Sequence, residues 1–429
     1  MADVQANAQK LGILVGGGPA PGINSVIRAA TLRARGEGME VLGLPHGYSE
    51  IMQGKVDGVR ALTELDVRDI HLAGGAVLGT SRANPTKKPA DLDRLVQTLG
   101  TLGVTQLITI GGDDTAFSAM KVAARAGAAL RVAHVPKTID NDLDLPPHID
   151  TFGFQTARHL GVSLVQNLIL DARASARWYL VVAMGRKAGS LALGIAKAAG
   201  AQIAVIPEEF AGGKASLDKI ADNIVGAIVK RRAQGYKDGV AVVAEGLGEI
   251  IPEDELHRLG RVEHDEHGHI RMAEIDLGRG LHNVVEERLR ALGIGTSVVS
   301  KDIGYELRCA SPIPFDIEYT GNLGCCAAQF LIEGGSSAMV SIQEGRFVPI
   351  PFANMIDPVT GHTRVRTVAI DSLQYAVARS FMTRLRKADF ADAQGLASLA
   401  RATNLEAKAF AERFAYVVED EPRPLALVR

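Results

Sequence analysis

Residues 11–22 read LGILVGGGPAPG, an apolar run that leads directly into a glycine-rich turn. The run LGILV has the composition of a strand that is buried on both faces, and a helical pattern through Val26, Ile27, Ala30 and Leu32 follows the turn. A buried strand, a glycine turn and a helix make one βα unit. Because the same unit recurs along the chain, this stretch indicates a parallel α/β fold.

The recurrences of this unit predict where ligands bind. Apolar strands at 106–110 (QLITI) and 176–183 (ARWYLVVA) lead into the turns GGDDT and MGRKAG, and helical patterns follow at 116–127 and 190–200. We expect further strands at 132–135, 203–206 and 240–244, and C-terminal helices at 373–386 and 405–416. The carboxyl ends of parallel strands meet at one edge of a sheet, and ligands bind there in open α/β folds.

Composition excludes several classes of protein. The chain has 429 residues, enough for two domains, and its net charge of -2 creates no field that would attract nucleic acid or an anionic membrane. No apolar run approaches the ~20 residues that span a bilayer, and the polar start MADVQANAQK lacks a signal-peptide core. Three cysteines are too few for a disulfide framework, and we expect adjacent Cys325 and Cys326 to be buried apolar filler. We therefore expect a cytoplasmic protein that binds neither nucleic acid nor membrane.

The turn GGGPAPG at 16–22 can bring main-chain N–H groups close to a phosphate at a helix N-terminus. Glycine is also common in such turns for steric reasons alone. From this loop by itself, the two explanations are equally good.

The turn GGDDT is more informative because two carboxylates open its helix. Gly111 and Gly112 permit close approach of a ligand to the main chain. Helix capping would need only one aspartate. A second carboxylate, from the pair Asp113 and Asp114, suits a Mg²⁺ ion that bridges phosphate oxygens.

The segment PKTIDNDL at 136–143 follows a predicted strand and concentrates polar side chains. An ordinary turn of solvated residues is the alternative interpretation. In the functional interpretation, a carboxylate accepts a proton from an attacking hydroxyl and a cation neutralises the transferred phosphoryl group. Asp140 and Lys137 fit these two roles, and Asp142 could hold the metal or orient Asp140.

Together these motifs resemble those of the phosphofructokinase family. The resemblance rests on motifs that occur in the family's order over roughly the first three-quarters of the chain: GGxxPGxN (17–24), LGTSR (78–82), GGDDT (111–115), TIDND (138–142), MGR (184–186), AEG (244–246) and GYxxR (304–308). It implies two Rossmann-like parallel-sheet βα domains with the active site between them. Residues 1–152 and about 308–365 would bind the phosphoryl donor and Mg²⁺, and residues 153–307 and about 366–429 would bind the sugar phosphate.

The resemblance also assigns roles to individual residues. It makes Asp140 the base that deprotonates the 1-hydroxyl of fructose 6-phosphate, Asp113 the ligand of Mg²⁺, and Arg186 a cation beside the transferring group. The residues implied at the donor phosphates are Gly17, Arg82, Gly112, Asp114 and Lys137. The residues implied at the sugar phosphate are Thr138, Asp140, Asp142, Arg177, Met184, Gly185, Arg186, Glu245, Tyr305 and Arg308. Arg177 matches an arginine that reaches the sugar phosphate of a neighbouring subunit, which implies a homodimer or homotetramer.

Two positions distinguish the phosphoryl donors within this family. The ATP-using branch reads GGDGS and PGTIDND where this chain reads GGDDT and PKTIDND. A carboxylate at Asp114 would repel the α-phosphate of a nucleotide, and the charge of Lys137 would offset a leaving phosphate. The chain thus resembles the pyrophosphate-dependent branch, whose products are fructose 1,6-bisphosphate and phosphate and whose reaction runs in both directions.

Three alternatives stay open at this point. The chain could be an ATP-dependent phosphofructokinase, which Asp114 and Lys137 argue against. It could be a lipid or nicotinamide-dinucleotide kinase with a GGDG-like loop, although TIDND, MGR and GYxxR are not expected there. It could be a non-catalytic subunit that binds sugar phosphate, against which the presence of Asp113, Asp140 and Arg186 argues.

A histidine-rich stretch at 258–271 suggests a metal site at first sight. The spacing of His264, His267 and His269 fits no common zinc pattern, so we expect a polar surface loop instead.

Overall fold

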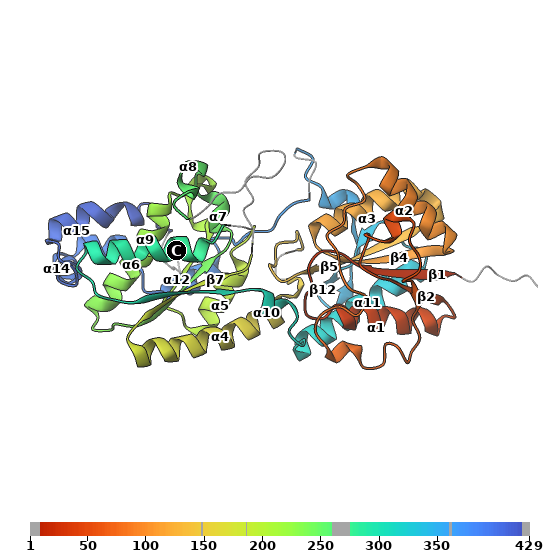
Figure 1. The fold of residues 1–429 in the computed structure, drawn as a ribbon, viewed down its shortest axis with the longest axis horizontal. Helices are drawn as coiled ribbons and strands as arrows, with labels where there is room; N and C mark the ends of the chain where they lie inside the picture. Colours follow the sequence, from red (N-terminus) through yellow and green to blue (C-terminus); the bar gives the residue numbers. More distant parts are fainter. Residues whose placement is uncertain (1–8, 147–148, 186, 260–274, 360–362, 423–429) are drawn as a thin grey trace, which may run out of the picture. The chain divides into compact units, whose positions relative to one another are not determined.

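The computed structural model describes residues 9–146, 149–185, 187–259, 275–359 and 363–422. The chain divides into two compact units (Figure 1). Unit 1 comprises Met1–Ala157 and Tyr305–Arg366, and unit 2 comprises Arg158–Gly304 and Thr367–Arg429. The sequence-based division placed the corresponding changes after residues 152, 307 and 365. The histidine-rich stretch from residue 260 onward lies outside the described residues.

Unit 1 contains a mainly parallel sheet. Its strands are β1 (Lys10–Val15), β2 (Glu40–Leu44), β3 (Arg60–Ala61), β4 (Val104–Gly111), β5 (Arg131–Thr138), β6 (Phe152–Gly153), β11 (Ala338–Met339) and β14 (Ile350–Pro351). Their order is β14-β11-β5-β4-β1-β2-β3, with β6 beside β5. Only β3 and β14, at the two edges, pair in an antiparallel manner. Parallel β1, β4 and β5 therefore end side by side at the same edge of the sheet.

Helices cover both faces of this sheet (Figure 1). They are α1 (Ile23–Gly36), α2 (Pro89–Thr101), α3 (Asp113–Ala126) and α11 (Pro314–Ile332). Unit 1 also contains the short helix α10 (Tyr305–Arg308) and a hairpin of β12 (Ile342–Gln343) and β13 (Arg346–Phe347). Helices α1 and α11 lie on one face, and α2 and α3 lie on the other. Leu11, Ile13 and Leu14 of β1 are fully buried, as expected for a strand covered on both faces.

Unit 2 contains a parallel sheet of order β10-β7-β9-β8. Its strands are β7 (Trp178–Ala183), β8 (Ile203–Val205), β9 (Gly239–Ala244) and β10 (Val298–Ile303). Its helices are α4 (Phe154–Ser175, from Arg158 on), α5 (Ser190–Ala199), α6 (Leu217–Ala233), α7 (Leu247–Ile250), α8 (Glu253–Leu256), α9 (Leu277–Ala291), α12 (Leu373–Ser380), α13 (Lys387–Ala391), α14 (Ala393–Arg401) and α15 (Ala407–Phe414). Strands β7 and β9 are buried along their whole length.

These sheets confirm the predicted α/β class. Three local predictions were wrong: the end of the strand before TIDND, the burial of Cys325 and Cys326, and the length of the helix predicted at 373–386. Strand β5 extends through Pro136, Lys137 and Thr138, which the sequence had placed in a turn, because β6 continues its ladder at Lys137 and Thr138. Cys325 is exposed and Cys326 is half-buried, so this pair is not buried filler.

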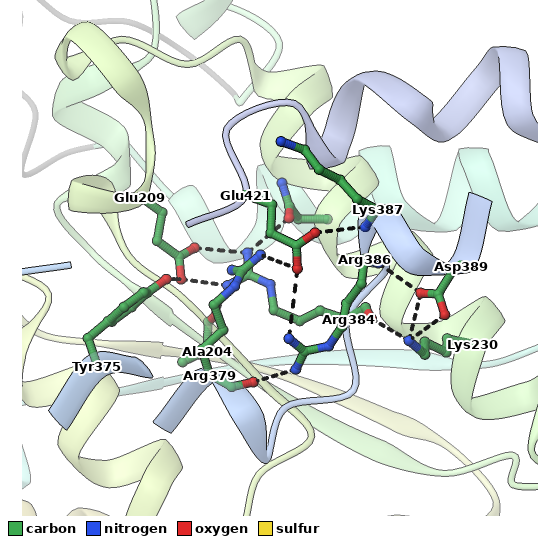
Figure 2. Close-up of polar contacts among 11 residues, drawn as sticks. Ala204, Glu209, Lys230, Tyr375, Arg379, Arg384, Arg386, Lys387, Asp389 and Glu421 are labelled. Carbon is green, nitrogen blue, oxygen red and sulfur yellow. Dashed lines mark hydrogen bonds and ion pairs between the residues drawn. The ribbon is translucent and has the colours of Figure 1, made fainter. Parts of the chain in front are cut away.

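The predicted helix at 373–386 ends at Ser380 because other contacts compete for the residues that follow. The N–H of Thr383 donates to the carbonyl of Gln202 at 2.7 Å, beside edge strand β8. Arg384 then bonds both carboxylate oxygens of Glu209, at 2.5 and 2.9 Å (Figure 2). The chain after Ser380 is therefore tied to the residues in and beside β8 rather than continuing the helix.

Across the described part of the chain, no helix combines the length and the apolarity needed to cross a bilayer.

Candidate active site

The carboxyl edge of the unit 1 sheet brings the predicted phosphate-binding turns together. The N–H of Gly16, after β1, donates to the carbonyl of Ile110 at the end of β4 at 2.8 Å. The N–H of Gly17 donates to the carbonyl of Ser81 at 2.8 Å, which ties in the LGTSR segment. Hence GGGPAPG, LGTSR and GGDDT converge on one edge, as the parallel topology predicts.

Thr115 explains why glycines flank this edge. A Cβ atom on Gly16 would lie 2.4 Å from the Thr115 Oγ1, and one on Gly111 would lie 2.3 Å from it. The buried threonine therefore fills the space that side chains would otherwise need. Glycine at these two positions has a packing reason that is independent of any ligand.

The two aspartates of GGDDT lie in the first turn of α3. The residue that caps this helix is Gly112, which has no side chain to bond the helix N–H groups, so simple capping does not explain the aspartates. Asp113 Oδ1 accepts a hydrogen bond from the N–H of Asp114 at 2.9 Å. Both carboxylates lie at the N-terminal end of α3, which is the positive end of the helix dipole.

Lys137 is the most unusual group at this edge. Its side chain is buried, and its Nζ donates to the carbonyl of Gly18 at 2.5 Å. Gly17 has a φ of +79°, and a Cβ atom there would lie 3.2 Å from the ammonium. Burial, together with the charge of Arg308, lowers the pKa of Lys137 from 10.5 to about 8.

Other charges gather around Lys137. Asp140 and Asp142 raise its pKa and Arg82 lowers it, so all three lie within electrostatic reach of the ammonium. The guanidinium of Arg308 reaches the same turn, because a Cβ atom on Gly18 would lie 3.3 Å from its Cζ. Several cations at one glycine turn suit a ligand with several phosphate oxygens, and the carboxylates can accept a proton.

Tyr305 and Arg308 form a pair on α10. The guanidinium carbon of Arg308 lies 5.1 Å from the centre of the Tyr305 ring. The tyrosine is 77% exposed, so its ring and hydroxyl are open to a ligand. This geometry leaves the guanidinium fork available for phosphate oxygens.

The main chain of the TIDND loop is held in a specific shape. The N–H of Asp140 donates to Thr138 Oγ1 at 3.0 Å, and Asn141 takes the left-handed conformation with φ 57°. The side-chain amide of Asn141 donates to Asp150 at 2.8 Å and accepts from the N–H of Thr151 at 3.0 Å. Asparagine tolerates this conformation better than most residues, which explains its place beside Asp140.

Arg366 braces the same loop and was missed by the sequence analysis. Its Nε donates to the carbonyl of Asn141 at 3.1 Å, its Nη1 to that of Ile149 at 2.6 Å, and its Nη2 to Asn141 Oδ1. The N–H of Arg366 also donates to the carbonyl of Asp142 at 2.8 Å. No sequence signal indicates this contact, because Arg366 lies 225 positions from Asn141.

His134 is a second residue that the sequence analysis missed. It is fully buried in β5, with Nε2 3.0 Å from the carbonyl of Gly111 and Nδ1 2.8 Å from Thr109 Oγ1. A carbonyl can only accept, so Nε2 carries the proton and the Thr109 hydroxyl donates to Nδ1. Burial lowers the pKa of His134 to about 3, so the ring stays neutral and fixes the start of the GGDDT turn.

The donor set at this edge fits a hard cation. The candidate ligands are the carboxylates of Asp113, Asp140 and Asp142, and Mg²⁺ prefers oxygen ligands. Among the described residues, no three His, Cys, Asp or Glu side chains come close enough to enclose a metal ion by themselves.

Unit 2 places Met184, Gly185 and Glu245 at the carboxyl ends of β7 and β9. Glu245 Oε2 accepts from the N–H of Gly185 at 3.1 Å, and the carbonyl of Gly185 accepts from the N–H of Gly246 at 3.0 Å. The N–H of Met184 donates to the carbonyl of Ile303 at 3.0 Å. The MGR and AEG motifs are thus neighbours, although Arg186 itself lies outside the described residues.

Arg177 lies at the other end of β7. It directly precedes this strand, whereas Met184 directly follows it. A six-residue strand rises about 3.3 Å per residue, so roughly 20 Å separates the two. Within one chain, Arg177 and Met184 cannot bind the same phosphate group.

Comparison with known proteins gives consistent results. The family model for phosphofructokinase matches residues 10–331. The chain is 48% identical over 417 residues to a pyrophosphate–fructose 6-phosphate 1-phosphotransferase of Thermotoga maritima, covering 96% of this chain and 99% of that protein. A protein of the same name from Naegleria fowleri is 44% identical over 422 residues, covering 96% and 97%. The crystal structure of a pyrophosphate-dependent phosphofructokinase from Marinobacter aquaeolei shares the fold, with a TM-score of 0.65 and 17% identity over 86% of this chain and 88% of that one.

Proposed function

The chain belongs to the phosphofructokinase family, and we propose that it transfers a phosphoryl group reversibly from pyrophosphate to the 1-hydroxyl of fructose 6-phosphate. The products are fructose 1,6-bisphosphate and phosphate. The observation that carries the proposal is the buried ammonium of Lys137, which lies against the Gly18 carbonyl among Arg308, Asp140 and Asp142. Two relatives that match nearly the whole chain bear the name of this reaction.

In the proposed reaction, Asp140 is the general base. Its carboxylate takes the proton from the 1-hydroxyl while that oxygen forms a bond to a phosphorus atom of pyrophosphate. The bond from this phosphorus to the bridging oxygen breaks, and the leaving phosphate keeps the electron pair. General-base assistance of this kind contributes about 10²–10⁴-fold to a rate, provided that the carboxylate is held in place. The Arg366 and Asn141 contacts provide that positioning.

The cations at the glycine turn bind and neutralise the donor. Lys137 balances the charge of the leaving phosphate, and Arg82 contributes from the LGTSR segment. The missing side chains at Gly17 and Gly112 let the phosphates come close to the main chain. Transfer of a phosphoryl group depends mainly on such positioning and charge stabilisation.

The choice of pyrophosphate over ATP rests on Asp114 and Lys137. Asp114 is an exposed carboxylate in the first turn of α3, where it would repel the α-phosphate of a nucleotide. Lys137 occupies the position of a glycine in the ATP-using branch, and its side chain fills the space next to Gly17. Both features act against a nucleotide, and pyrophosphate lacks the group that they would exclude.

Enzymes of this family need a divalent metal, and we propose Mg²⁺ held by Asp113. When bound there, the ion would supply positive charge to neutralise the phosphates of the donor. Asp142 either adds a ligand or orients Asp140.

The sugar phosphate is assigned to a further set of residues. We propose that it is bound by Thr138, Asp140, Asp142, Met184, Gly185, Glu245, Tyr305 and Arg308, with Arg186, outside the described residues, beside the transferring group. Glu245 can accept hydrogen bonds from sugar hydroxyls, and Arg308 can bind phosphate as a fork. The placement of Arg177 at the opposite end of β7 supports its predicted role toward a neighbouring copy, in a homodimer or homotetramer.

The reverse reaction tests this proposal directly. With Mg²⁺, the purified protein should convert fructose 1,6-bisphosphate and phosphate into fructose 6-phosphate and pyrophosphate, detected with a coupled dehydrogenase. Omission of phosphate should abolish the rate. Binding of fructose 6-phosphate without turnover in either direction would instead support the alternative of a non-catalytic subunit that binds sugar phosphate.

A further inference from the structure

Glu208 joins three separate parts of unit 2. It lies in a short 3-10 turn, Pro207–Glu209, that follows β8. Its Oε1 accepts from the N–H of Gly189 at 2.9 Å and from the N–H of Val368 at 3.0 Å. The carboxylate thus connects the end of β8 with the start of α5. It also connects β8 with Val368, at the start of the C-terminal segment Thr367–Arg429.

Gly189 closes the connection between β7 and α5 that begins with Met184 and Gly185. It is the N-cap residue of α5 and offers no side chain to bond the helix N–H groups. A Cβ atom on Gly189 would lie 2.4 Å from Ile206 Cβ and 2.7 Å from Glu208 Oε2. The main chain at Gly189 therefore rests directly on the 3-10 turn, with Glu208 as its hydrogen-bond partner.

This connection is held by a glutamate at each end. Glu245 holds its start through the N–H of Gly185, at 3.1 Å, and Glu208 holds its end through the N–H of Gly189. Glu245 is assigned to the substrate by the family motif, whereas Glu208 belongs to none of the motifs above. Burial raises the pKa of Glu208, so this carboxylate is a costly way to satisfy two amides if stability is its only role.

We propose that Glu208 is a positioning residue for the sugar phosphate at Met184 and Gly185. It acts through Gly189 and the adjoining Ala188, whose carbonyl oxygen would lie 2.9 Å from a Cβ atom on Gly185. The proposal rests on the proposed function, since it assumes that Met184 and Gly185 bind fructose 6-phosphate. Glu208 does not touch the substrate. Its loss leaves the N–H of Gly189 without its acceptor and lets the end of the connection move.

The adjacent residue Glu209 provides a matched control because it points to a different partner. Its carboxylate accepts from Arg384 Nη1 at 2.5 Å, from Arg384 Nη2 at 2.9 Å and from the Tyr375 hydroxyl at 2.5 Å (Figure 2). Figure 2 shows these side chains converging from the C-terminal segment. Glu209 therefore anchors that segment, and its change should affect stability rather than the sugar-phosphate connection.

The test compares Glu208→Ala, Glu208→Gln and Glu209→Gln with the wild type. The measured quantities are KM for fructose 6-phosphate, KM for pyrophosphate, kcat and Tm. We expect Glu208→Ala to raise KM for fructose 6-phosphate by roughly tenfold, because the N–H of Gly189 loses its acceptor and the adjoining main chain is no longer held in place. KM for pyrophosphate should change by less than about twofold, since the donor turn does not contain this contact.

The conservative variant separates positioning from bulk stability. Glu208→Gln keeps a carbonyl oxygen that can accept from Gly189, so its KM for fructose 6-phosphate should stay within about threefold of the wild type. Glu209→Gln should lower Tm with both KM values unchanged. An unchanged KM for fructose 6-phosphate in Glu208→Ala would overturn the proposal. Equal rises of KM for both substrates, accompanied by a fall in Tm, would also overturn it, because they would indicate a general loss of stability. A wild type that does not use fructose 6-phosphate would instead refute the proposed function, so the two failures are distinguishable.

Discussion

The Nζ of Lys137 donates a hydrogen bond to the main-chain carbonyl of Gly18 at 2.5 Å, which joins β5 to the glycine turn after β1. The bond places a buried cation at a turn that Arg308 also reaches. Burial and Arg308 disfavour the charged form of Lys137, whereas Asp140 and Asp142 favour it. A pyrophosphate ligand would add further negative charge and favour the ammonium more strongly.

The pKa of Lys137 predicts an alkaline limit to activity. The free enzyme holds this pKa at about 8, lowered from 10.5 mainly by burial, so the ammonium is charged below pH 8 and neutral above it. We expect kcat/KM for pyrophosphate to fall as pH rises through about 8. The fall in kcat should come at higher pH, because bound pyrophosphate raises the pKa of the lysine.

Lys137→Arg provides the control for this pH profile. Arginine stays charged throughout the measured range, so the variant should lack the fall near pH 8 even if its overall rate is lower. If kcat/KM for pyrophosphate fell identically near pH 8 in both proteins, the titrating group would be another one, such as the substrate.

Asp140→Asn should abolish proton transfer while preserving shape. We expect kcat to fall by about 10³-fold with small changes in both KM values, since general-base assistance contributes about 10²–10⁴-fold. Asp144→Asn is a matched control, because Asp144 is exposed and pairs only loosely with Arg364, at 3.7 Å. It should retain wild-type kcat. A kcat for Asp140→Asn within tenfold of the control would exclude Asp140 as the base.

The double variant Asp114→Gly with Lys137→Gly tests the donor assignment. Loss of the Lys137 charge should reduce kcat/KM for pyrophosphate by roughly tenfold or more, because a charge-assisted hydrogen bond is worth about 1.5–3 kcal/mol. Removal of the Asp114 carboxylate should raise the relative rate with ATP. Initial rates with each donor, at saturating fructose 6-phosphate, give the ratio. Unchanged pyrophosphate kinetics would contradict the donor argument.

Arg366→Ala should loosen the loop that carries Asp140. The variant leaves the acceptors at Asn141 and Ile149 without their donor, which should lower stability by about 3 kcal/mol and reduce kcat more than it raises KM. Thermal unfolding and steady-state rates measure the two effects. Arg364→Ala, which removes an exposed pair at 3.7 Å, should be nearly neutral. Equal kinetics in the two variants would remove Arg366 from the positioning role.

The sequence predicts the parallel sheets well because most central strands are short apolar runs with a glycine at the end or within two residues of it. It predicts β1, β4, β7 and β9 within a few residues for this reason. It fails where tertiary contacts override local pattern. Arg384 stands in a segment with a helical pattern, yet it lies outside both α12 and α13 and pairs with Glu209.

For the candidate site too, the sequence predicts residues in local motifs but not the distant residues that support them. Lys137, Asp140 and Asp113 stand in compact motifs, so the residues themselves could be named from the sequence. Their supporting contacts come from elsewhere in the chain. His134 reads as part of an apolar strand, and Arg366 lies in a segment without any motif. Neither contact has a signal in local sequence, because both depend on which strands and segments become neighbours.

The most direct test of the account is the initial rate of fructose 6-phosphate phosphorylation with Mg²⁺, measured in parallel with pyrophosphate and with ATP. The account predicts a large preference for pyrophosphate in kcat/KM. A preference for ATP would contradict the roles given to Asp114 and Lys137 while leaving the family and Asp140 intact.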